Sequence, residues 1–477
     1  MKDTNKYITT AIPYVNGKPH IGHVMDYLIA DCLARYFRMG HDVRFSAGLD
    51  EHGCKVEQEA LKAGVTPLEF VNNLEPDFTG MLEVLNISYT DFIRTTDENH
   101  IARVQEIWKK LDKAGVIYKA KYEGWYCGGC ECFITESEAK SSEYICPNHQ
   151  KSFEKIEEEN YFLKISKFSD ELRDFAKKNI IPEFRGREIL ELIKDGAQDV
   201  SISRSREKLN WGVPVPGDET QVMYVWVDAL SNYITVLGYP ENDISDWWPA
   251  EVQVVGKDIL RFHAIIWPAM LLALGLELPK TLFAHGFINL QGGKMSKSLG
   301  NVVDPIEITA SYGADAVRYY FLRHGPIFDD ADFSLEKFVT AYNSELANDL
   351  GNLVSRLANM IRKYEIKAGW TGGPTRISGE VEKYHNYLAK YEVNRAIDTI
   401  WEMIKSCNQF IDETKPWELA KDDQEKLTEV LNILWGDIMI IQTLLTPFLP
   451  DTATKIKDIF ASDTAKEAKI LFPRVEL

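Results

Sequence analysis

The sequence predicts an α/β domain built on a parallel sheet, interrupted by one insertion and followed by an all-α domain. Three observations support this fold class. A strand, a glycine turn, a helix and a second strand follow one another at the N-terminus; a cysteine-rich and then acidic stretch breaks the pattern after residue 115; and strand signals vanish after residue 334. With 477 residues, of which 45% are hydrophobic, the chain is long enough for two to four packed domains.

The first 50 residues read as the opening unit of a nucleotide-binding fold. Residues 6–14 (KYITTAIPY) are rich in β-branched and aromatic side chains and predict a buried strand. From His20 onward, apolar residues recur at helical spacing until Gly40, which is typical of a helix end. Residues 41–50 (HDVRFSAGLD) predict the second strand. This order is typical of Rossmann-like domains with a parallel sheet.

The same signals divide the rest of the chain. Residues 51–115 show helical spacing, strands return at 221, 251 and 281, and residues 337–460 read as a helical bundle. The apolar segment 264–276 is too short to span a bilayer and predicts a buried helix. The predicted domains are 1–115 and 216–325 for the two halves of the α/β domain, 116–215 for the insertion, 326–345 for a linking segment and 346–477 for the helical domain.

Charge and cysteine content restrict the class of protein. The net charge of −18 argues against broad non-specific binding to nucleic acid but leaves room for a local basic face. The first residues lack the apolar stretch of a secretory signal, so we expect a soluble, cytoplasmic protein that does not contact a membrane. Four of the seven cysteines lie within residues 127–146, a distribution that indicates reduced thiols around a metal ion.

A paired ligand pattern lies in the insertion. CGGC (127–130) and CPNH (146–149) place a C-x2-C pair and a C-x2-H pair on two tight turns, a spacing typical of a closed tetrahedral zinc site. Buried thiols are the alternative, although the polar, glycine-rich surroundings argue against burial. We therefore predict a zinc knuckle with one structural Zn²⁺, and we place Cys132 outside it. The predicted ligands are Cys127, Cys130, Cys146 and His149.

Two histidines lie at the start of the first predicted helix, in the stretch GKPHIGHVMD. His20 and His23 could ligate a metal together with Asp50, or one of them could be a core residue. A third reading follows from their position, because a helix N-terminus after a glycine turn binds anions. Gly22 would let such a ligand approach the backbone closely. The four letters HIGH alone leave these alternatives open.

A second motif, GGKMSKSLGN at 292–301, favours the phosphate reading. It presents Lys294, Lys297 and Ser298 in a loop with glycines on both sides. Ammonium and hydroxyl donors in such a loop suit a triphosphate on which charge builds in the transition state, whereas a solvated basic loop is the plainer alternative. The pair of motifs, HIGH early and KMSKS late on an α/β fold, resembles the class I aminoacyl-tRNA synthetases.

The flanking residues are similar to one family of that class, the methionyl-tRNA synthetases. AIPYVNGKPHIGH, GLDEHG, YVWVDALSNY, GKDILRFHAIIWPAM and KPWELAK match its motifs, and the resemblance covers essentially the whole chain. Leu49 and Leu230 depart from the Thr and Pro that family members carry there. The resemblance implies a methionine–tRNA ligase, which uses ATP to form methionyl-adenylate and pyrophosphate and then transfers methionine to the 3′-terminal adenosine of tRNA(Met).

The resemblance also implies roles for individual residues, with Mg²⁺ accompanying ATP. Asp50 would bind the substrate ammonium, and Tyr14 or His263 would offer a donor to the thioether sulfur. Plain core packing is the alternative for each aromatic residue of the methionine site. The implied catalytic residues are His20, His23, Lys294 and Lys297; Gly22, Gly256, Asp258 and Ser298 join them in binding ATP; Ile12, Tyr14, Asp50, Trp226, Ala229, Tyr233, Ile259 and His263 bind methionine; Asn352, Arg356 and Trp417 bind the anticodon.

Two other classes of function remain open from the sequence. A non-catalytic tRNA-binding relative, or another adenylyl-transferring enzyme with a similar HxGH turn, would share part of the pattern, but the intact KMSKS motif and Asp50 argue against both.

Residues 351–376 contain five basic side chains and one acidic side chain, which provides a local basic face for tRNA. The chain stops soon after the predicted bundle, without room for an appended dimerising domain, and we expect a monomer.

Overall fold

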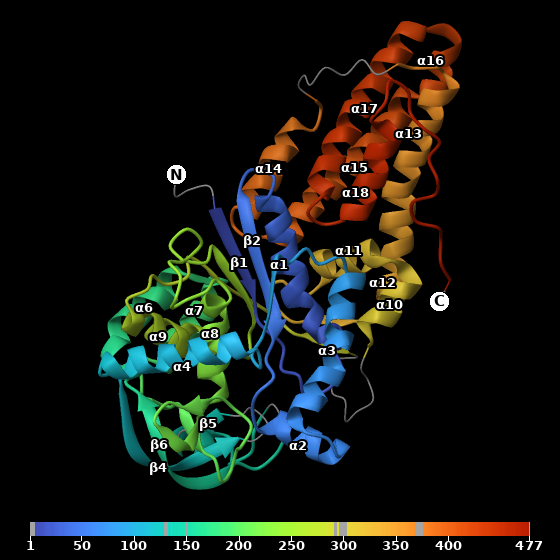
Figure 1. Ribbon diagram of the computed structural model, residues 1–477. Coiled ribbons are helices and arrows are strands. Elements are labelled where there is room, and N and C mark those ends of the chain that lie inside the picture. Colours follow the sequence, from blue (N-terminus) through green and yellow to red (C-terminus); the bar gives the residue numbers. More distant parts are fainter. Residues whose placement is uncertain are drawn as a thin grey trace. The chain divides into compact units, whose positions relative to one another are not determined.

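The structure is a computed structural model that describes residues 5–127, 132–134, 136–147, 150–290, 293–294, 303–367 and 375–476. It contains two compact units (Figure 1). Unit 1 consists of Met1–Pro19, Gly40–Gly80 and Ser88–Ala284, and unit 2 consists of His20–Met39, Met81–Ile87 and His285–Leu477. Each unit is therefore assembled from three separate stretches of the chain.

Unit 1 is built on a six-stranded sheet, in the order β3-β2-β1-β12-β13-β7. Strands β3, β2, β1 and β12 pair in parallel, and β13 pairs in parallel with β7, so the predicted parallel-sheet α/β class is confirmed. All residues of β12 are buried, as expected where helices cover both faces of a parallel sheet. The strands are β1 (Asn5–Thr10), β2 (Asp42–Leu49), β3 (Asp91–Arg94), β7 (Ile180–Ile181), β12 (Val252–Gly256) and β13 (Leu282–His285).

Two edge strands differ from the sequence-based expectation. The prediction of continuous helical spacing over 51–115 is wrong for Asp91–Arg94, which form β3 beside β2. Ile180–Ile181 lie inside the stretch read as an insertion, yet they pair with Leu282 and Phe283 as β7. Both segments are too short to show a period, because their strand conformation depends on a distant partner and not on local preference.

The insertion contains a second sheet, of order β5-β4-β6-β8, in which neighbours are antiparallel. The acidic stretch EKIEEEN begins β6, and Glu159 of that strand lies opposite Lys121 of β4. Opposite charges on facing residues stabilise an antiparallel pair, so the Lys121–Glu159 position favours the pairing of β4 with β6. The strands are β4 (Ile117–Cys127), β5 (Cys132–Ile134), β6 (Glu154–Leu163) and β8 (Val200–Ser201); a third sheet joins β9 (Ser203–Ser205), β10 (Pro214–Val215) and β11 (Asp218–Met223).

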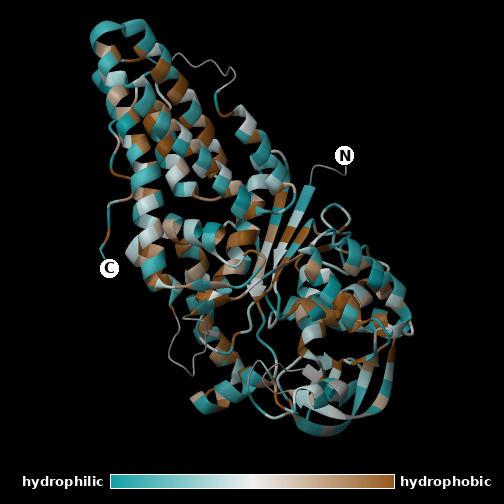
Figure 2. Ribbon diagram, turned by 180° about the vertical axis from the view of Figure 1, so that it is seen from behind, coloured by the Kyte–Doolittle hydropathy of each residue, from teal (hydrophilic) through white to brown (hydrophobic). Residues whose placement is uncertain are grey.

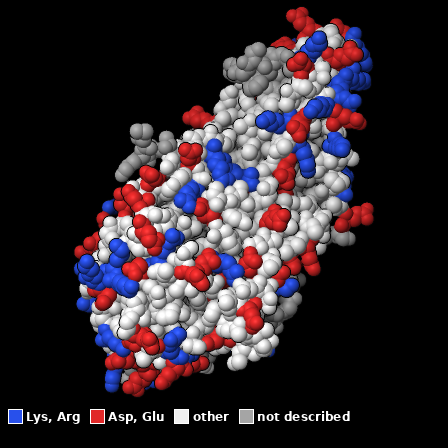
Figure 3. Space-filling model, in the orientation of Figure 1, with Lys and Arg blue, Asp and Glu red and all other residues white. Residues whose placement is uncertain are grey.

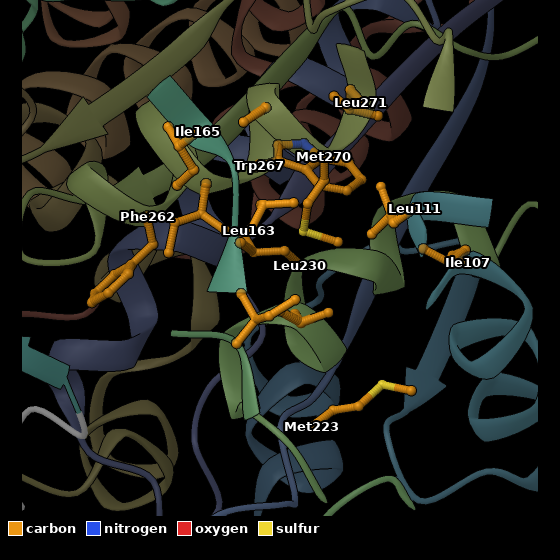
Figure 4. Close-up of a cluster of buried hydrophobic side chains, with 14 of the residues drawn as sticks. Ile107, Leu111, Leu163, Ile165, Met223, Leu230, Phe262, Trp267, Met270 and Leu271 are labelled. Carbon is orange, nitrogen blue, oxygen red and sulfur yellow. The ribbon is translucent and has the colours of Figure 1, made fainter. Parts of the chain in front are cut away.

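The helices of unit 1 enclose a large apolar core, part of which Figure 4 shows. Trp267, Met270 and Leu271 lie on α9 and are fully buried, which confirms the buried helix predicted for 264–276. Pro268 stands in the first turn of α9, where a missing backbone N–H is tolerated. The helices are α2 (Cys54–Ala63), α3 (Pro67–Val84, whose last turn belongs to unit 2), α4 (Glu98–Lys113), α5 (Glu136–Ser141), α6 (Ser169–Lys178), α7 (Glu183–Leu192), α8 (Val225–Thr235) and α9 (Trp267–Leu274), with short turns η2 (Ile165–Phe168) and η3 (Phe262–Ile266).

Unit 2 combines the helix that follows HIGH with the C-terminal helices. The predicted all-α C-terminal domain is confirmed, and hydrophilic and hydrophobic residues alternate along the turns of its helices (Figure 2). Its elements are η1 (Ile21–His23), α1 (Val24–Phe37), β14 (Ile288–Leu290), β15 (Gly293–Lys294), α10 (Pro305–Tyr312), α11 (Ala314–His324), β16 (Ala331–Phe333), α12 (Leu335–Ala341), η5 (Tyr342–Gly351), α13 (Asn352–Lys363), α14 (Ser378–Leu388), α15 (Val393–Thr414), α16 (Pro416–Asp422), α17 (Gln424–Leu445) and α18 (Pro450–Phe460).

Helix α17 is the most apolar of the long helices. Within the described ranges it is the one helix whose length and composition would also suit a membrane span. Leu431, Leu434, Ile441 and Leu445 along it are nearly or fully buried in unit 2. Such burial is typical of the central helix of a packed bundle, which passes the same test of length and hydropathy.

Arg318 on α11 is completely buried in unit 2 and binds three other parts of that unit. Its Nη2 lies 2.7 Å from a carboxylate oxygen of Asp31, which is itself fully buried on α1. Its guanidinium also donates to the carbonyl oxygens of Leu85 at 3.2 Å, Pro447 at 3.0 Å and Phe448 at 2.8 Å. Helix α1, the segment 81–87 and the turn between α17 and α18 therefore meet at one side chain.

Candidate functional site

The two histidines of the HIGH motif form a stacked pair at the start of α1. Their ring centroids are 3.9 Å apart and the ring planes differ by 21°. The Nδ1 atom of His20 accepts the backbone N–H of Gly22 at 3.1 Å, and the Nδ1 atom of His23 accepts the backbone N–H of His20 at 3.1 Å. An imidazole that accepts at Nδ1 carries its proton at Nε2 in the neutral form. The turn therefore fixes the tautomer of both rings, and Nε2–H is the donor of each.

The first turn of α1 has a further partner in unit 2 that the sequence analysis missed. His285 Nε2 lies 3.1 Å from Asp26 Oδ1, three residues after His23. Gly286 follows, and a Cβ there would lie 2.4 Å from the carbonyl oxygen of Asp329, so only glycine fits. A histidine–glycine pair directly after a buried strand was the available signal. Within unit 2, the ion pair thus joins the first turn of α1 to His285.

The KMSKS motif lies for the most part outside the described residues. Lys294 is described only in its backbone, where it pairs with Asn289 of β14 in an antiparallel bridge. Lys297 and Ser298 are outside the described ranges, and so is Ser296. The described chain leaves β15 and resumes before α10, whose Asp304 N-cap accepts the backbone N–H of Ile306 at 2.7 Å. Ile21 of the HIGH turn donates its backbone N–H to Val303 at 3.1 Å, so the HIGH turn contacts the end of this segment within unit 2.

In unit 1, three neighbouring strands carry predicted ligand-binding residues at their carboxyl ends. Ile12 and Tyr14 follow β1, Asp50 follows β2, and Gly256 ends β12. Backbone bonds join the first two: Asp50 donates to Pro13 O at 2.9 Å and accepts from Val15 N at 2.9 Å, so Tyr14 lies directly opposite Asp50. The carboxyl edge of a parallel sheet is where α/β folds bind their ligands. The structure thus brings Tyr14 and Asp50 together at that edge.

An aromatic group in unit 1 contains three of the residues predicted for the methionine site. Trp226 of α8 stacks on Phe262 with a centroid distance of 4.0 Å and an angle of 10°, and its ring meets His263 edge-on at 6.0 Å. Tyr233, two turns along α8, has its hydroxyl 2.8 Å from His263 Nε2. Trp226 is half-buried whereas Tyr233 and His263 are buried. Phe262 was not among the residues predicted for the methionine site, and its stacking on Trp226 adds it to this aromatic group.

Hydrogen bonds assign the proton on His263. Its Nδ1 lies 3.0 Å from the carbonyl oxygen of Ile259, and a carbonyl can only accept. Nδ1 therefore carries the proton, and Nε2 accepts the hydroxyl hydrogen of Tyr233. Tyr233 in turn is anchored from the other side, because Tyr7 donates to its backbone carbonyl at 2.9 Å. Both nitrogens of His263 are thus engaged in orienting Tyr233 and the turn at Ile259, and in this state His263 is not the predicted donor to a thioether.

The remaining predicted residues of unit 1 lie close in sequence to this group. Ala229 is buried on α8 between Trp226 and Tyr233. Asp258 is exposed just after β12, where Ile259 donates its backbone N–H to Gly256 at 3.2 Å and closes a turn. Leu49 and Leu230, the two departures from the family pattern, are both fully buried, at the end of β2 and on α8.

Two of the four predicted zinc ligands lie in the described part of the insertion. Cys127 and Cys146 are buried and reduced. Cys146 lies on a tight turn, since its N–H donates to Lys151 O and its carbonyl accepts from Gln150 N, both at 2.8 Å. Cys130 and His149 lie outside the described residues, and within the described ranges no group of three or more His, Cys, Asp or Glu side chains could hold a metal.

The predicted anticodon residues lie on two helices of unit 2. Asn352 and Arg356 are one turn apart on α13, and Arg356 donates to Asp412 at 2.7 Å near the end of α15. Helix α16 starts shortly afterwards and carries Trp417, whose side chain is 42% exposed and so is not a core residue. Basic and acidic side chains alternate over this end of the bundle (Figure 3). Of the predicted basic face, Arg376 is bound to the buried Asp437 at 3.2 Å.

Comparisons with known proteins cover the whole chain. Residues 6–155 and 146–358 match the family model described as tRNA synthetases class I (M), and residues 374–470 match the anticodon binding domain of methionyl tRNA ligase. The methionine–tRNA ligase of Clostridium tetani is 46% identical over 95% of this chain and 73% of its own length; that of Brucella melitensis is 41% identical over 96% and 92%. The methionyl-tRNA synthetase of Mycobacterium tuberculosis, solved with methionyl-adenylate, has 36% identity and a TM-score of 0.91, covering 99% of this chain and 100% of that one.

Proposed function

The chain belongs to the methionyl family of class I aminoacyl-tRNA synthetases, and from that premise we propose how its residues share the work. It is an ATP-dependent methionine–tRNA ligase: methionine and ATP give methionyl-adenylate and pyrophosphate, and methionine then passes to the 3′-terminal adenosine of tRNA(Met). The observation that carries this conclusion is the match of both family models, which cover residues 6–358 and 374–470. In ATP–pyrophosphate exchange with each amino acid in turn, methionine should be the substrate; exchange with another amino acid instead would contradict it.

The phosphate-binding role belongs to the HIGH turn and the KMSKS motif. His20 and His23 have their protons fixed at Nε2, which makes each ring a neutral hydrogen-bond donor suited to an anion. Lys294 and Lys297 add charge that follows the triphosphate as pyrophosphate leaves, and Ser298 adds a hydroxyl donor. Catalysis then consists of positioning the carboxylate for in-line attack and stabilising charge on the phosphate oxygens, without a protein nucleophile. Gly22 permits close approach, Gly256 and Asp258 hold the ribose, and Mg²⁺ accompanies ATP.

The methionine-binding role belongs to the carboxyl edge of the sheet and to α8. Asp50 binds the substrate ammonium beside Tyr14, and the thioether lies against Trp226 and Tyr233. A flexible apolar side chain gains mainly from packing on aromatic and aliphatic surface, which this group offers. Ile12, Ala229, Ile259 and His263 complete the site. Because one methylene is worth about 1–3 kcal/mol in such a pocket, discrimination against shorter substrates rests on how rigidly these residues are held.

The five-part domain division remains part of this proposal: 1–115, 116–215, 216–325, 326–345 and 346–477. The antiparallel sheet of β4, β5, β6 and β8 is the body of the inserted domain. The zinc knuckle lies at its far end, with Cys127 and Cys146 as buried thiol ligands and Cys130 and His149 completing the tetrahedron. When bound, the ion would cross-link two turns of the inserted domain.

The zinc proposal predicts one metal ion per chain in the purified protein. Cys130→Ser and His149→Ala should each reduce the zinc content and lower the thermal stability of the insertion, because a three-ligand site binds zinc more weakly. Cys132→Ser is the matched control, since Cys132 lies in the same segment but outside the ligand pattern, and it should retain the full zinc content. Metal analysis of the three variants decides: zinc absent from the wild type, or lost only in Cys132→Ser, contradicts the assignment.

The anticodon role predicts a separation of the two half-reactions. An exposed tryptophan suits stacking on an unpaired base, which is worth about 1–3 kcal/mol per base. Trp417→Ala should therefore lower the rate of tRNA charging about tenfold or more, with ATP–pyrophosphate exchange unchanged, whereas Trp417→Phe should keep much of the charging rate because it keeps a ring. Equal losses of exchange and charging in Trp417→Ala would show that the side chain acts in some other way.

A further inference from the structure

A buried carboxylate in unit 1 lies between two buried imidazoles, and no role was assigned above to any of these three residues, although Asp228 stands in the motif YVWVDALSNY and His52 in GLDEHG. Asp228 on α8 is 1% exposed; its Oδ2 lies 2.7 Å from His52 Nδ1 and its Oδ1 lies 2.9 Å from His100 Nε2. Burial raises the pKa of Asp228, but the two histidines outweigh burial and lower that pKa to about 2. A buried carboxylate that is ionised at neutral pH is costly unless each oxygen has a donor, and here each has one.

The histidines attach α8 to two different parts of unit 1. His100 lies on α4, and its other ring nitrogen is 2.7 Å from the Thr235 hydroxyl. Asp228 and Thr235 are seven residues apart, two turns along the same face of α8, so one imidazole spans both turns. Arg103, one turn further along α4, donates to the carbonyl of Thr235 at 2.7 Å. Hydrogen bonds therefore connect α8 to α4 at Asp228 and at Thr235.

The second histidine attaches α8 to the segment that carries Asp50. His52 lies two residues after Asp50, and its ring also packs on Trp211 with a centroid distance of 5.1 Å. Trp211 donates its indole N–H to Glu51 O at 2.6 Å, and the Glu51 carboxylate binds Arg94 at 2.8 Å. The segment after β2 is therefore held by contacts with Trp211 and Arg94, and the bond from His52 to Asp228 links it to α8.

These contacts join the two ends of the proposed methionine site. Asp50 would hold the substrate ammonium, while Trp226 and Tyr233 on α8 would hold the side chain. We propose that Asp228 is a positioning residue of this site, which fixes the spacing between the Asp50 segment and α8 through His52 and His100. The inference rests on the proposed assignment of Asp50, Trp226 and Tyr233. A misplacement of about 1 Å costs on the order of 100-fold in such sites, and looser spacing weakens discrimination by length.

Asp228→Asn is the direct test, because the amide has the same shape but only one acceptor oxygen for two imidazole donors. In ATP–pyrophosphate exchange the KM for methionine should rise about 10- to 100-fold, while the KM for ATP stays within about threefold. Discrimination by kcat/KM against norvaline, one methylene equivalent shorter, should fall about tenfold. Discrimination against norleucine, which matches methionine in length, should change little, since it does not depend on the spacing.

Conservative variants distinguish positioning from a loss of stability. An asparagine amide can replace the Nδ1 donor of His52, and a glutamine amide can replace the Nε2 donor of His100. His52→Asn and His100→Gln should therefore keep a KM near the wild-type value, whereas His52→Ala and His100→Ala should raise it. Ile234→Ala is the matched control: Ile234 is fully buried on the same helix with an apolar side chain, so the variant should lose thermal stability without a change in the KM for methionine.

The outcomes separate this inference from the assignment on which it rests. If Trp226→Ala and Asp50→Asn leave the KM for methionine unchanged, the site assignment is wrong and the inference falls with it. If those two variants raise the KM but Asp228→Asn affects only stability, as Ile234→Ala does, the site stands and the positioning role is overturned. Should Asp228→Asn fail to fold, the pair His52→Ala and His52→Asn decides: equal KM values in both variants would overturn the proposal.

Discussion

Replacement of Lys297 by alanine is expected to slow the formation of methionyl-adenylate by about 10²–10³-fold, the usual cost of removing one donor from a site of developing charge. In the role proposed for Lys297, the ammonium would act on the triphosphate as the bond to pyrophosphate breaks, and not on the methionine side chain. The KM for methionine should therefore stay near its wild-type value while the rate falls. Rapid-quench measurement of a single turnover with labelled ATP reports the chemical step directly.

A surface lysine of unit 2 supplies the control for this experiment. Lys337 on α12 is exposed, and its replacement by alanine removes the same charge from the same unit outside the KMSKS motif. Lys337→Ala should leave the single-turnover rate unchanged, which excludes a general effect of net charge. An unaltered rate in Lys297→Ala, or a loss confined to the KM for methionine, would refute the role of Lys297 in stabilising the moving triphosphate.

Replacement of Arg318 by methionine is expected to destabilise unit 2 by about 3–5 kcal/mol, because it leaves the buried Asp31 carboxylate with one partner fewer. Three carbonyl oxygens, on Leu85, Pro447 and Phe448, lose their donor at the same time. Asp31 keeps its bond to Arg35 at 2.7 Å, which limits the loss. Urea unfolding followed by circular dichroism at the helical wavelengths would measure the change.

Two further variants test whether the cost comes from the buried charge. The double variant Asp31→Leu, Arg318→Met should recover part of the lost stability, because it removes the carboxylate together with the guanidinium. Arg395→Ala removes an arginine from a largely exposed ion pair with Glu392 and should change stability by less than about 0.5 kcal/mol. A loss in Arg318→Met no larger than in Arg395→Ala would show that the buried pair adds nothing to stability.

The parts of the fold that the sequence predicted are those specified by neighbouring residues. β1, the HIGH turn, α1 and β2 follow from local periodicity and from a glycine near the end of a helix, and the structure confirms them within a few residues. β3 and β7 were not predicted, because strands of four and two residues are too short to show a period. Their conformation comes from pairing with strands far along the chain, which single-sequence patterns do not contain.

The residues of the candidate site also differ in whether the sequence could predict them. Tyr14, Asp50 and Trp226 could be proposed because they stand inside recognisable motifs. The role of Asp228 could not, although Asp228 stands in the same motif as Trp226, because its contact with His100 joins residues 128 positions apart. The proton on His263 was also beyond the sequence, because it depends on which ring nitrogen meets the carbonyl of Ile259. Motifs therefore indicate which residues bind the substrates, whereas the hydrogen bonds that orient these residues can be read only from the three-dimensional structure.

The burial of Arg318 has a consequence for the protein while the ribosome is still making it. Asp31 leaves the ribosome early, but Arg318 and the carbonyl of Phe448, which complete its surroundings, follow only after about 290 and 420 further residues. At 5–20 residues per second, helix α1 waits roughly 20–80 s for that last partner. Throughout this interval helix α1, whose apolar side chains are buried in the finished protein, lacks the partners that Arg318 and the turn between α17 and α18 provide. We therefore expect α1 to be a binding site for chaperones during synthesis.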